Sequence, residues 1–204
     1  MKLVKYLFIT LMILTSPIVS AQSDSTSTSV NQYTISELTI EPGIGINPYP
    51  TTDFIVSNVL QYNLKRRLSI FSYTTYNANN AFVHTFNYIT NDYNYTLSQK
   101  FGIGTTFYAK KASHTISLLG GIKYETYKET LDIPAFEKVS VSFSSVSPDA
   151  GLMYNLKIGR KKYFFTYRMY IPLYPYPLLT SDILATDANI ANISMEIGVG
   201  IRIK

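Results

Sequence analysis

The sequence contains neither cysteine nor tryptophan, and only 15% of its 204 residues are charged. Without cysteine the protein has no disulfide, no thiolate metal site and no lipidated cysteine, which suits passage through an oxidising compartment. Soluble domains carry roughly 25% charged residues, so a soluble surface built from this chain would be poorly solvated. After the first 21 residues no run of about 18 apolar residues occurs, and the sequence therefore predicts no membrane-spanning helix.

Histidine is also scarce, and the net charge is small. The two histidines, His84 and His114, lie in separate segments and cannot form a local two-histidine metal site, so we expect no metal and no cofactor. Lysine and arginine number 18 against 13 acidic residues, and the excess falls to about three once Lys2 and Lys5 leave with a leader. An excess this small does not indicate a nucleic-acid partner.

The first 33 residues read as two segments that precede the fold. Residues 1–21 have a basic start, an apolar centre and a small-residue end at Val19-Ser20-Ala21, which is the pattern of a cleaved secretory signal. Residues 22–33 are a Ser/Thr-rich tract that can bury nothing, so we expect a disordered lead-in. The remaining residues, 34–204, are expected to form one domain.

Alternation with a period of two is clearest at the end of the chain, over residues 193–203. Its odd positions are all apolar, and its even positions are Ser194, Glu196, Gly198, Gly200 and Arg202. Such a segment is a β-strand with two unlike faces. Glycines with a few single charges suit the inside of a narrow barrel, and the apolar face would then contact lipid.

Seven earlier segments show the same alternation with varying clarity. Pro42 interrupts the first of them, where we expect a bulge or a bend, and the lipid-facing side of the second and third is left open. The eight predicted strands are residues 37–46, 53–64, 68–77, 93–108, 115–125, 147–158, 165–171 and 193–203.

The connections alternate between short and long. Short basic turns are expected at 65–67, 109–113 and 159–162, whereas a loop at 47–52 and longer loops at 78–92, 128–144 and 174–189 lie on the other side. An even strand count with short turns at one end and long loops at the other is typical of outer-membrane barrels, and it places both chain ends on the turn side.

These features resemble the small eight-stranded outer-membrane barrels of Gram-negative bacteria, the OmpA/OmpX-type transmembrane domains. The resemblance covers roughly residues 34–204 and implies an all-β, antiparallel, up-and-down transmembrane barrel in the outer membrane. It further implies contact with outer-membrane lipid and with the barrel-insertion machinery. The alternative is a soluble lipocalin-like barrel with its apolar face turned inward, and that barrel would need a well-charged outer face.

A barrel of eight strands leaves a lumen that side chains can fill. Met153 and Tyr170 are expected there, and the inward charges should form a structural network, because an isolated buried ion is costly. A narrow path for ions lined by the same groups is the alternative. The expected lumen charges are Glu37, Glu41, Lys100, Lys123, Glu125, Asp149, Arg168, Glu196 and Arg202.

Aromatic side chains gather near the ends of the predicted strands, where amphipathic rings prefer the lipid–water interface. We expect one girdle at the loop side and one at the turn side. The residues are Tyr93, Tyr95, Tyr124 and Tyr127 in the first, and Phe107, Tyr163, Phe164 and Phe165 in the second.

Three functions remain compatible with this chain. The first is a non-enzymatic structural or surface-interaction barrel whose loops 78–92, 128–144 and 174–189 meet an extracellular ligand or partner, because binding tends to occur on such loops. The second is a narrow conduit for ions or a small apolar solute. The least favoured is an outer-leaflet lipid-modifying enzyme built from His84, Asp92 and Ser145, since any loop-rich protein supplies such a trio.

Overall fold

The computed structural model describes residues 37–47, 53–64, 67–78, 89–133, 137–159, 161–174, 178–180, 187–189 and 193–203. These residues belong to one compact unit, Ile35–Lys204. The expected leader at 1–21 and lead-in at 22–33 lie outside the described residues and remain predictions. The strands are β1 (Leu38–Asn47), β2 (Asp53–Asn63), β3 (Leu68–Ala78), β4 (Ile89–Tyr108), β5 (Ala112–Leu131), β6 (Val139–Ile158), β7 (Tyr163–Tyr174), β8 (Leu178–Thr180), β9 (Asp187–Asn189) and β10 (Ser194–Ile203).

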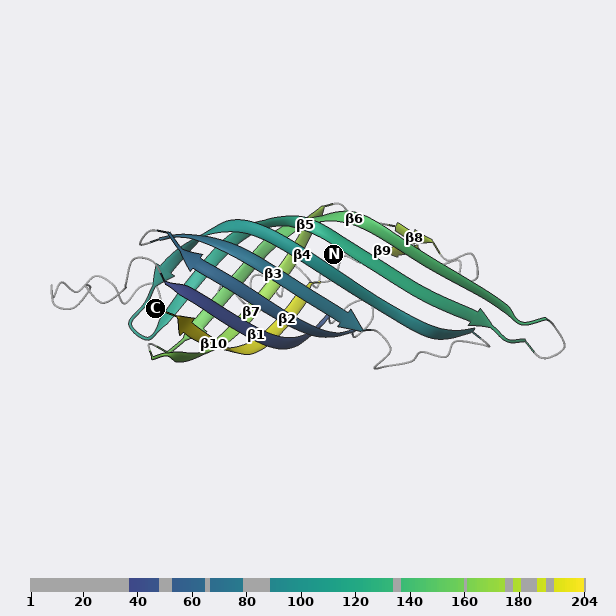
Figure 1. The fold of residues 1–204 in the computed structure, drawn as a ribbon, viewed down its shortest axis with the longest axis horizontal. Helices are drawn as coiled ribbons and strands as arrows, with labels where there is room; N and C mark the ends of the chain where they lie inside the picture. Colours follow the sequence, from purple (N-terminus) through teal and green to yellow (C-terminus); the bar gives the residue numbers. More distant parts are fainter. Residues whose placement is uncertain are drawn as a thin grey trace, which may run out of the picture. The chain divides into compact units, whose positions relative to one another are not determined.

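Eight of these strands form a closed barrel, which confirms the predicted all-β, antiparallel, up-and-down fold. Neighbours follow the order β1-β10-β7-β6-β5-β4-β3-β2, and β1 closes the ring by pairing with both β10 and β2. The turns after β2, β4 and β6 lie at the same end as the start of β1 and the end of β10, at the left of Figure 1. We call this the short-turn end and the opposite one the loop end.

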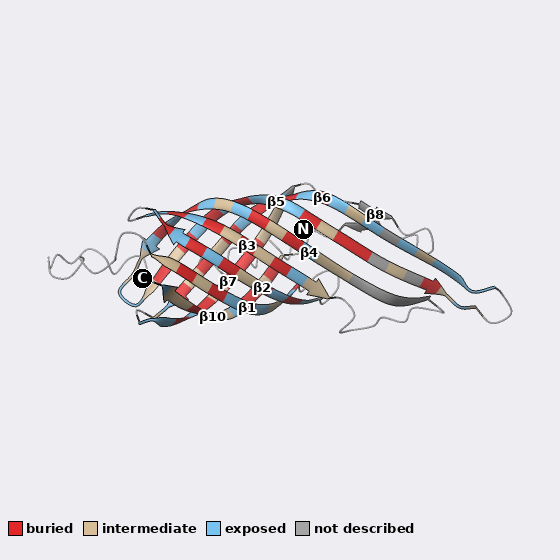
Figure 2. Cartoon of the chain, viewed as in Figure 1, coloured by how far each residue is buried: buried red, intermediate tan, exposed pale blue. Residues whose placement is uncertain are grey.

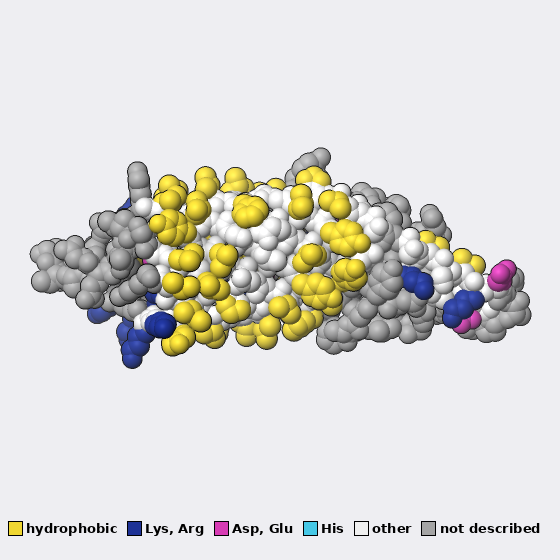
Figure 3. Space-filling model, in the orientation of Figure 1, with side chains coloured by type: hydrophobic (Ala, Val, Ile, Leu, Met, Phe, Trp, Pro, Cys, Tyr) yellow, Lys and Arg dark blue, Asp and Glu magenta, His cyan; other side chains and the backbone are white. Residues whose placement is uncertain are grey.

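Side chains alternate strictly between the lumen and the outer surface. Buried and exposed residues follow each other along the barrel strands (Figure 2). The outer face is an apolar belt (Figure 3), on which large side chains such as Phe101 and Ile103 are 62% and 60% exposed. The lumen holds most of the buried polar and charged residues. This polarity excludes the soluble lipocalin-like alternative, whose apolar face would point inward.

The register answers the two questions that the sequence left open. In β2 and β3 the outward residues include Val56, Leu60 and Ile70, whereas Phe71 and Tyr73 point into the lumen. Pro42 produces no bulge, because the pairing of β1 with β10 resumes in the same register after it. The ladder is interrupted only at Glu41 and Pro42, where a proline has no N–H to donate.

Strands extend into two of the expected long loops, so the predicted bounds of these loops were wrong. β5 continues to Leu131 and β6 begins at Val139, which leaves only residues 132–138 between them instead of 128–144. β4 already begins at Ile89, within the expected loop 78–92, and its register shifts between Asn91 and Tyr93. Within 174–189 the described residues include a small two-stranded ribbon, β8 with β9.

No helix in the described part of the chain is both long enough and apolar enough to cross a membrane.

Candidate functional site

The lumen holds five ion pairs arranged from the short-turn end to the loop end. All nine charges expected there take part, and Lys157 is the tenth member. Lys157 was not among the charges expected in the lumen, although the buried Glu41 carboxylate requires a cation beside it. The pairs are Glu37–Arg202 (2.7 Å), Glu41–Lys157, Arg168–Glu196 (3.1 Å), Lys100–Asp149 (2.7 Å) and Lys123–Glu125 (2.6 Å).

Arg168 is the centre of this network and is only 1% exposed. Its Nε donates to Glu196 Oε2 at 3.1 Å, its Nη1 to the Glu41 carbonyl at 2.7 Å and its Nη2 to Ser57 Oγ at 2.9 Å. The Glu196 carboxylate also accepts hydrogen bonds from Ser57 and Tyr73. Gly43 leaves the space for this guanidinium, because a Cβ at that position would lie 2.0 Å from Nη2.

A second cluster lies nearer the short-turn end. Lys157 pairs with Glu41, and Asn155 Nδ2 donates to Glu41 Oε2 at 2.8 Å. The Phe164 ring faces two cations, with Lys157 Nζ 5.2 Å and Arg202 Cζ 4.4 Å from its centroid. Phe164 is therefore a lumen residue, and its assignment to the lipid-facing girdle was wrong because β7 turns odd, not even, positions outward.

An apolar layer crosses the lumen between the charged groups. Met153 and Tyr170 lie in it as expected, and the buried cluster also contains Val59, Phe71, Tyr73 and Leu119. Phe71 and Leu119 were not among the side chains expected there, because the lumen was expected to hold mainly polar and charged residues. These six side chains are at most 6% exposed and occupy the lumen at this level.

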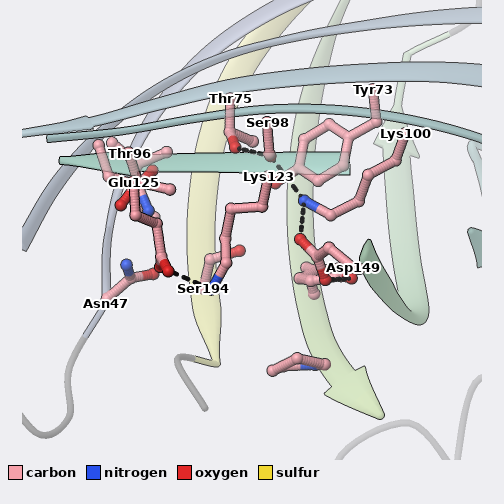
Figure 4. Close-up of a pocket in the computed structure, with 14 residues that line it drawn as sticks. Asn47, Tyr73, Thr75, Thr96, Ser98, Lys100, Lys123, Glu125, Asp149 and Ser194 are labelled. Atoms are coloured by element: carbon pink, nitrogen blue, oxygen red, sulfur yellow. Dashed lines mark hydrogen bonds and ion pairs between the residues drawn. The ribbon is translucent and has the colours of Figure 1, made fainter. Parts of the chain in front are cut away.

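Above this layer the lumen opens into a small polar chamber, drawn in Figure 4. Lys100 contacts Asp149 and Ser98, Tyr170 Oη donates to Asp149 at 2.7 Å, and the ammonium lies 4.6 Å from the Tyr170 ring centroid. The cavity is about 50 Å³, enough for a few water molecules at roughly 10–15 Å³ each. The buried Asn47 amide on its wall has no hydrogen-bond partner among the residues that the structure describes, as expected for a group that binds such water.

The described residues contain no cluster of metal-ligating side chains. No group of three or more His, Asp or Glu side chains there is arranged to hold a metal ion. Of the suggested catalytic trio, His84 and the Asp92 side chain lie outside the described residues, and only Ser145 can be placed, on β6. His114 is on the outer face, where its Nδ1 lies 2.7 Å from Tyr154 Oη.

Strands β4, β5 and β6 extend well past the rest of the barrel at the loop end (Figure 1). Each has 20 residues, against 10 to 12 in the other barrel strands. Pairing of β3 with β4 stops at Ala78↔Tyr95, and pairing of β6 with β7 stops at Ala150↔Tyr174. Two edges of this protruding sheet, Ile89–Asn94 and Val139–Asp149, thus have no strand partner among the described residues.

No protein-family model matches the sequence, and no curated protein matches it. Solved structures with a similar fold are small barrels whose sequences are 10–12% identical to this chain. They are Ail, the attachment invasion locus protein of Yersinia pestis (12% identity, TM-score 0.49, covering 82% of this chain and 97% of that one), Neisserial surface protein A (11%, 0.46, 83% and 95%) and the N-terminal β-barrel domain of Pseudomonas aeruginosa OprF (10%, 0.42, 82% and 97%).

Proposed function

We propose that this protein is a non-enzymatic outer-membrane barrel that interacts with a surface partner through its protruding sheet, and that its lumen is a structural plug. The lipid of the outer membrane surrounds the apolar belt in this proposal, and the barrel-insertion machinery delivers the chain. Two features of the barrel support the membrane part of the proposal.

The outer face of the barrel suits lipid along its whole circumference. Among the described barrel residues that point outward between the two ends, none is Asp, Glu, Lys or Arg. Charges on a lipid-facing strand position are destabilising by about 2–4 kcal/mol at the bilayer midplane. Tyr76, Tyr95 and Tyr124 lie together near the loop end, with ring centroids 6.0 and 6.3 Å apart, as amphipathic rings do at an interface.

The observation that carries the interaction role is the pair of edges on β4 and β6 that have no strand partner in the described part of the barrel. An exposed sheet edge presents a row of free N–H and C=O groups, which an extended segment of another protein can pair with. The β6 edge is the longer one, and three of its six exposed side chains are the small serines Ser140, Ser142 and Ser144, which leave the backbone accessible. We therefore infer that the partner supplies an extended polypeptide segment.

The membrane location is tested by fractionation and gel mobility. A closed barrel should sediment with outer membranes and migrate faster on SDS gels before heating than after boiling. Recovery of a soluble periplasmic monomer would contradict the proposed membrane location.

The edge is tested with proline substitutions at Ser144 and Ser145. Successive residues of a strand point their backbone groups to alternate neighbours, so one of these two positions faces the free edge. Purified protein is captured on immobilised reduced and carboxymethylated lactalbumin, an extended polypeptide that serves as a model partner. Proline at the edge-facing position should abolish capture, whereas Ser144→Ala and Ser145→Ala should retain it.

Heat-modifiable migration serves as the folding control for all four variants. Capture that survives proline at both positions would reject the β6 edge as the binding surface, even if the membrane location holds.

A further inference from the structure

The three short turns concentrate positive charge at one end of the barrel. Their sequences are Leu64-Lys-Arg-Arg67, Ala109-Lys-Lys111 and Gly159-Arg-Lys-Lys162, and they hold eight of the 18 lysines and arginines of the chain without any acidic residue. No feature of the proposed function uses these residues.

Backbone hydrogen bonds join the turns into one surface. Gly159 N–H donates to Lys111 O at 3.0 Å, which connects the last two turns, and Thr106 N–H donates to Arg67 O at 2.8 Å. Arg202 N–H donates to Lys162 O at 2.9 Å, so the end of β10 is tied to the same surface. We call the exposed cations Arg67, Lys110, Lys111, Lys161 and Lys162 the basic rim.

The basic rim has no counter-charge within the described part of the protein. In the lumen the five cations are matched by five carboxylates, so the lumen contributes no net charge. The one described carboxylate at the short-turn end, Glu37, is engaged by Arg202. At the loop end the signs are mixed, and Lys138 lies 3.3 Å from Asp132. Exposed as they are, the rim cations are available to an anionic neighbour.

Aromatic side chains surround the barrel directly beside the basic rim. Tyr163, Phe107 and Phe165 point outward there and are 61%, 49% and 44% exposed. Lys162 Nζ lies 5.9 Å from the centroid of the Tyr163 ring. Figure 3 shows the dark blue cations at the left end, immediately beyond the yellow apolar belt. Cations that border an aromatic girdle lie at the depth of lipid headgroups.

We propose that the basic rim binds the headgroups of anionic phospholipids in the leaflet that it faces. This inference rests on the proposed membrane location. The charges are spread over three turns along a rim and border a lipid-facing belt, which matches a planar array of phosphates better than it matches a compact acidic protein. Basic residues beside a membrane attract anionic lipid, and salt screens the attraction.

The test measures which lipid the protein retains. The full-length protein is purified in mild detergent and reconstituted into vesicles of equal parts phosphatidylglycerol and phosphatidylcholine. It is extracted gently, and the bound lipid is quantified by mass spectrometry. We expect several-fold enrichment of phosphatidylglycerol over the bulk ratio, reduced in 0.5 M salt, with each rim cation contributing to the preference.

The variants distinguish an effect of the basic rim on lipid binding from an effect of the protein's net charge. In Lys110→Gln/Lys111→Gln/Lys161→Gln/Lys162→Gln the enrichment should fall to within about twofold of the bulk ratio, because most of the attraction is removed. Lys110→Gln/Lys111→Gln should give an intermediate value. The matched control, Lys128→Gln/Lys138→Gln, also removes two cations, but from β5 and the β5–β6 connection beyond the barrel, and should leave the enrichment unchanged.

Three outcomes would overturn the inference: no enrichment in the unaltered protein, equal enrichment in the quadruple variant, or a loss of enrichment in the Lys128/Lys138 control as large as in its rim counterpart. A fourth is binding of soluble polyglutamate through the rim without any lipid preference, which would assign the surface to an acidic polymer. Failure of the protein to insert into vesicles of phosphatidylcholine alone would instead reject the membrane location itself.

Discussion

Arg168 shows how a single buried charge can specify the centre of the barrel. Its guanidinium uses three nitrogens on a carboxylate, a carbonyl and a hydroxyl that belong to β10, β1 and β2. Desolvating such a pair costs free energy that its own attraction only partly returns. The contacts of Arg168 therefore help to specify how these strands are aligned, and they add less to the net stability of the barrel.

Removing one partner of this pair should be strongly destabilising. We expect Arg168→Met to lower the free energy of unfolding by about 3–5 kcal/mol, because Glu196 then remains buried without its cation. The measurement is urea unfolding in vesicles of neutral lipid. Arg168→Met/Glu196→Gln should recover part of the loss, since no unpaired carboxylate remains.

The control is Arg202→Met at the short-turn end, where solvent reaches both partners of the ion pair with Glu37 and weakens it. Its loss should be clearly smaller than that of Arg168→Met. Equal losses would show that the central network is hydrated rather than dry.

Inward glycines make room for the large lumen side chains, and Gly200 gives the sharpest test. A Cβ at this position would lie 2.2 Å from Phe164 Cζ, and the three atoms nearest to it all belong to the Phe164 ring. We expect Gly200→Ala to cost about 1–3 kcal/mol of unfolding free energy through overpacking. Phe164→Leu in the same chain should restore most of it.

Gly120 offers the matched control, because it is exposed on the outer face and a Cβ there meets nothing within 4 Å. Gly120→Ala should leave the free energy of unfolding within about 0.5 kcal/mol of the starting value. A cost for Gly120→Ala as large as that for Gly200→Ala would mean that the effect comes from the strand backbone and not from Phe164.

At the scale of strands, the sequence predicts a strand well where one of its faces contacts lipid and the other faces the lumen. β10 was found with its bounds within one residue, because lipid and lumen demand unlike side chains at successive positions. Residues 139–144 of β6 do alternate valine or phenylalanine with serine, but this short run was assigned to the loop 128–144. That part of the strand projects beyond the apolar belt, so neither face has to be apolar.

The lumen was less predictable than the outer surface for a related reason. Lipid accepts only apolar side chains, whereas the lumen accepts any that fit together. Inward Phe71, Leu119 and Phe164 could not be distinguished from lipid-facing residues without the register. Pairing of individual charges likewise depends on which strands meet across the lumen.

The connections between strands should face opposite sides of the membrane. An epitope inserted after Ile133, in the connection between β5 and β6, should be labelled by antibody on intact cells. The same epitope between Lys110 and Lys111 should be labelled only after permeabilisation, because the short turns face the periplasm in this orientation. Heat-modifiable migration of both insertions is the folding control, and the reverse labelling pattern would invert the proposed topology.

For the whole molecule, the distribution of charge agrees with a barrel that seals its membrane. The lumen charges cancel in pairs, and the buried apolar side chains of Val59, Phe71, Leu119 and Met153 lie among them in the lumen. An ion that entered the polar chamber would have to lose its hydration shell to pass these side chains, which is costly without compensating ligands.

We therefore expect no stable single-channel conductance from the purified protein in a planar bilayer. A wide porin in the same bilayer provides the positive control, and protease protection of the reconstituted strands verifies insertion. Met153→Gly should not open a path by itself, because Phe71 and Leu119 still fill the cross-section. Reproducible openings in the unaltered protein would favour the conduit over the surface-interaction role. Such openings would require the apolar side chains of the lumen to move apart and the five ion pairs to rearrange.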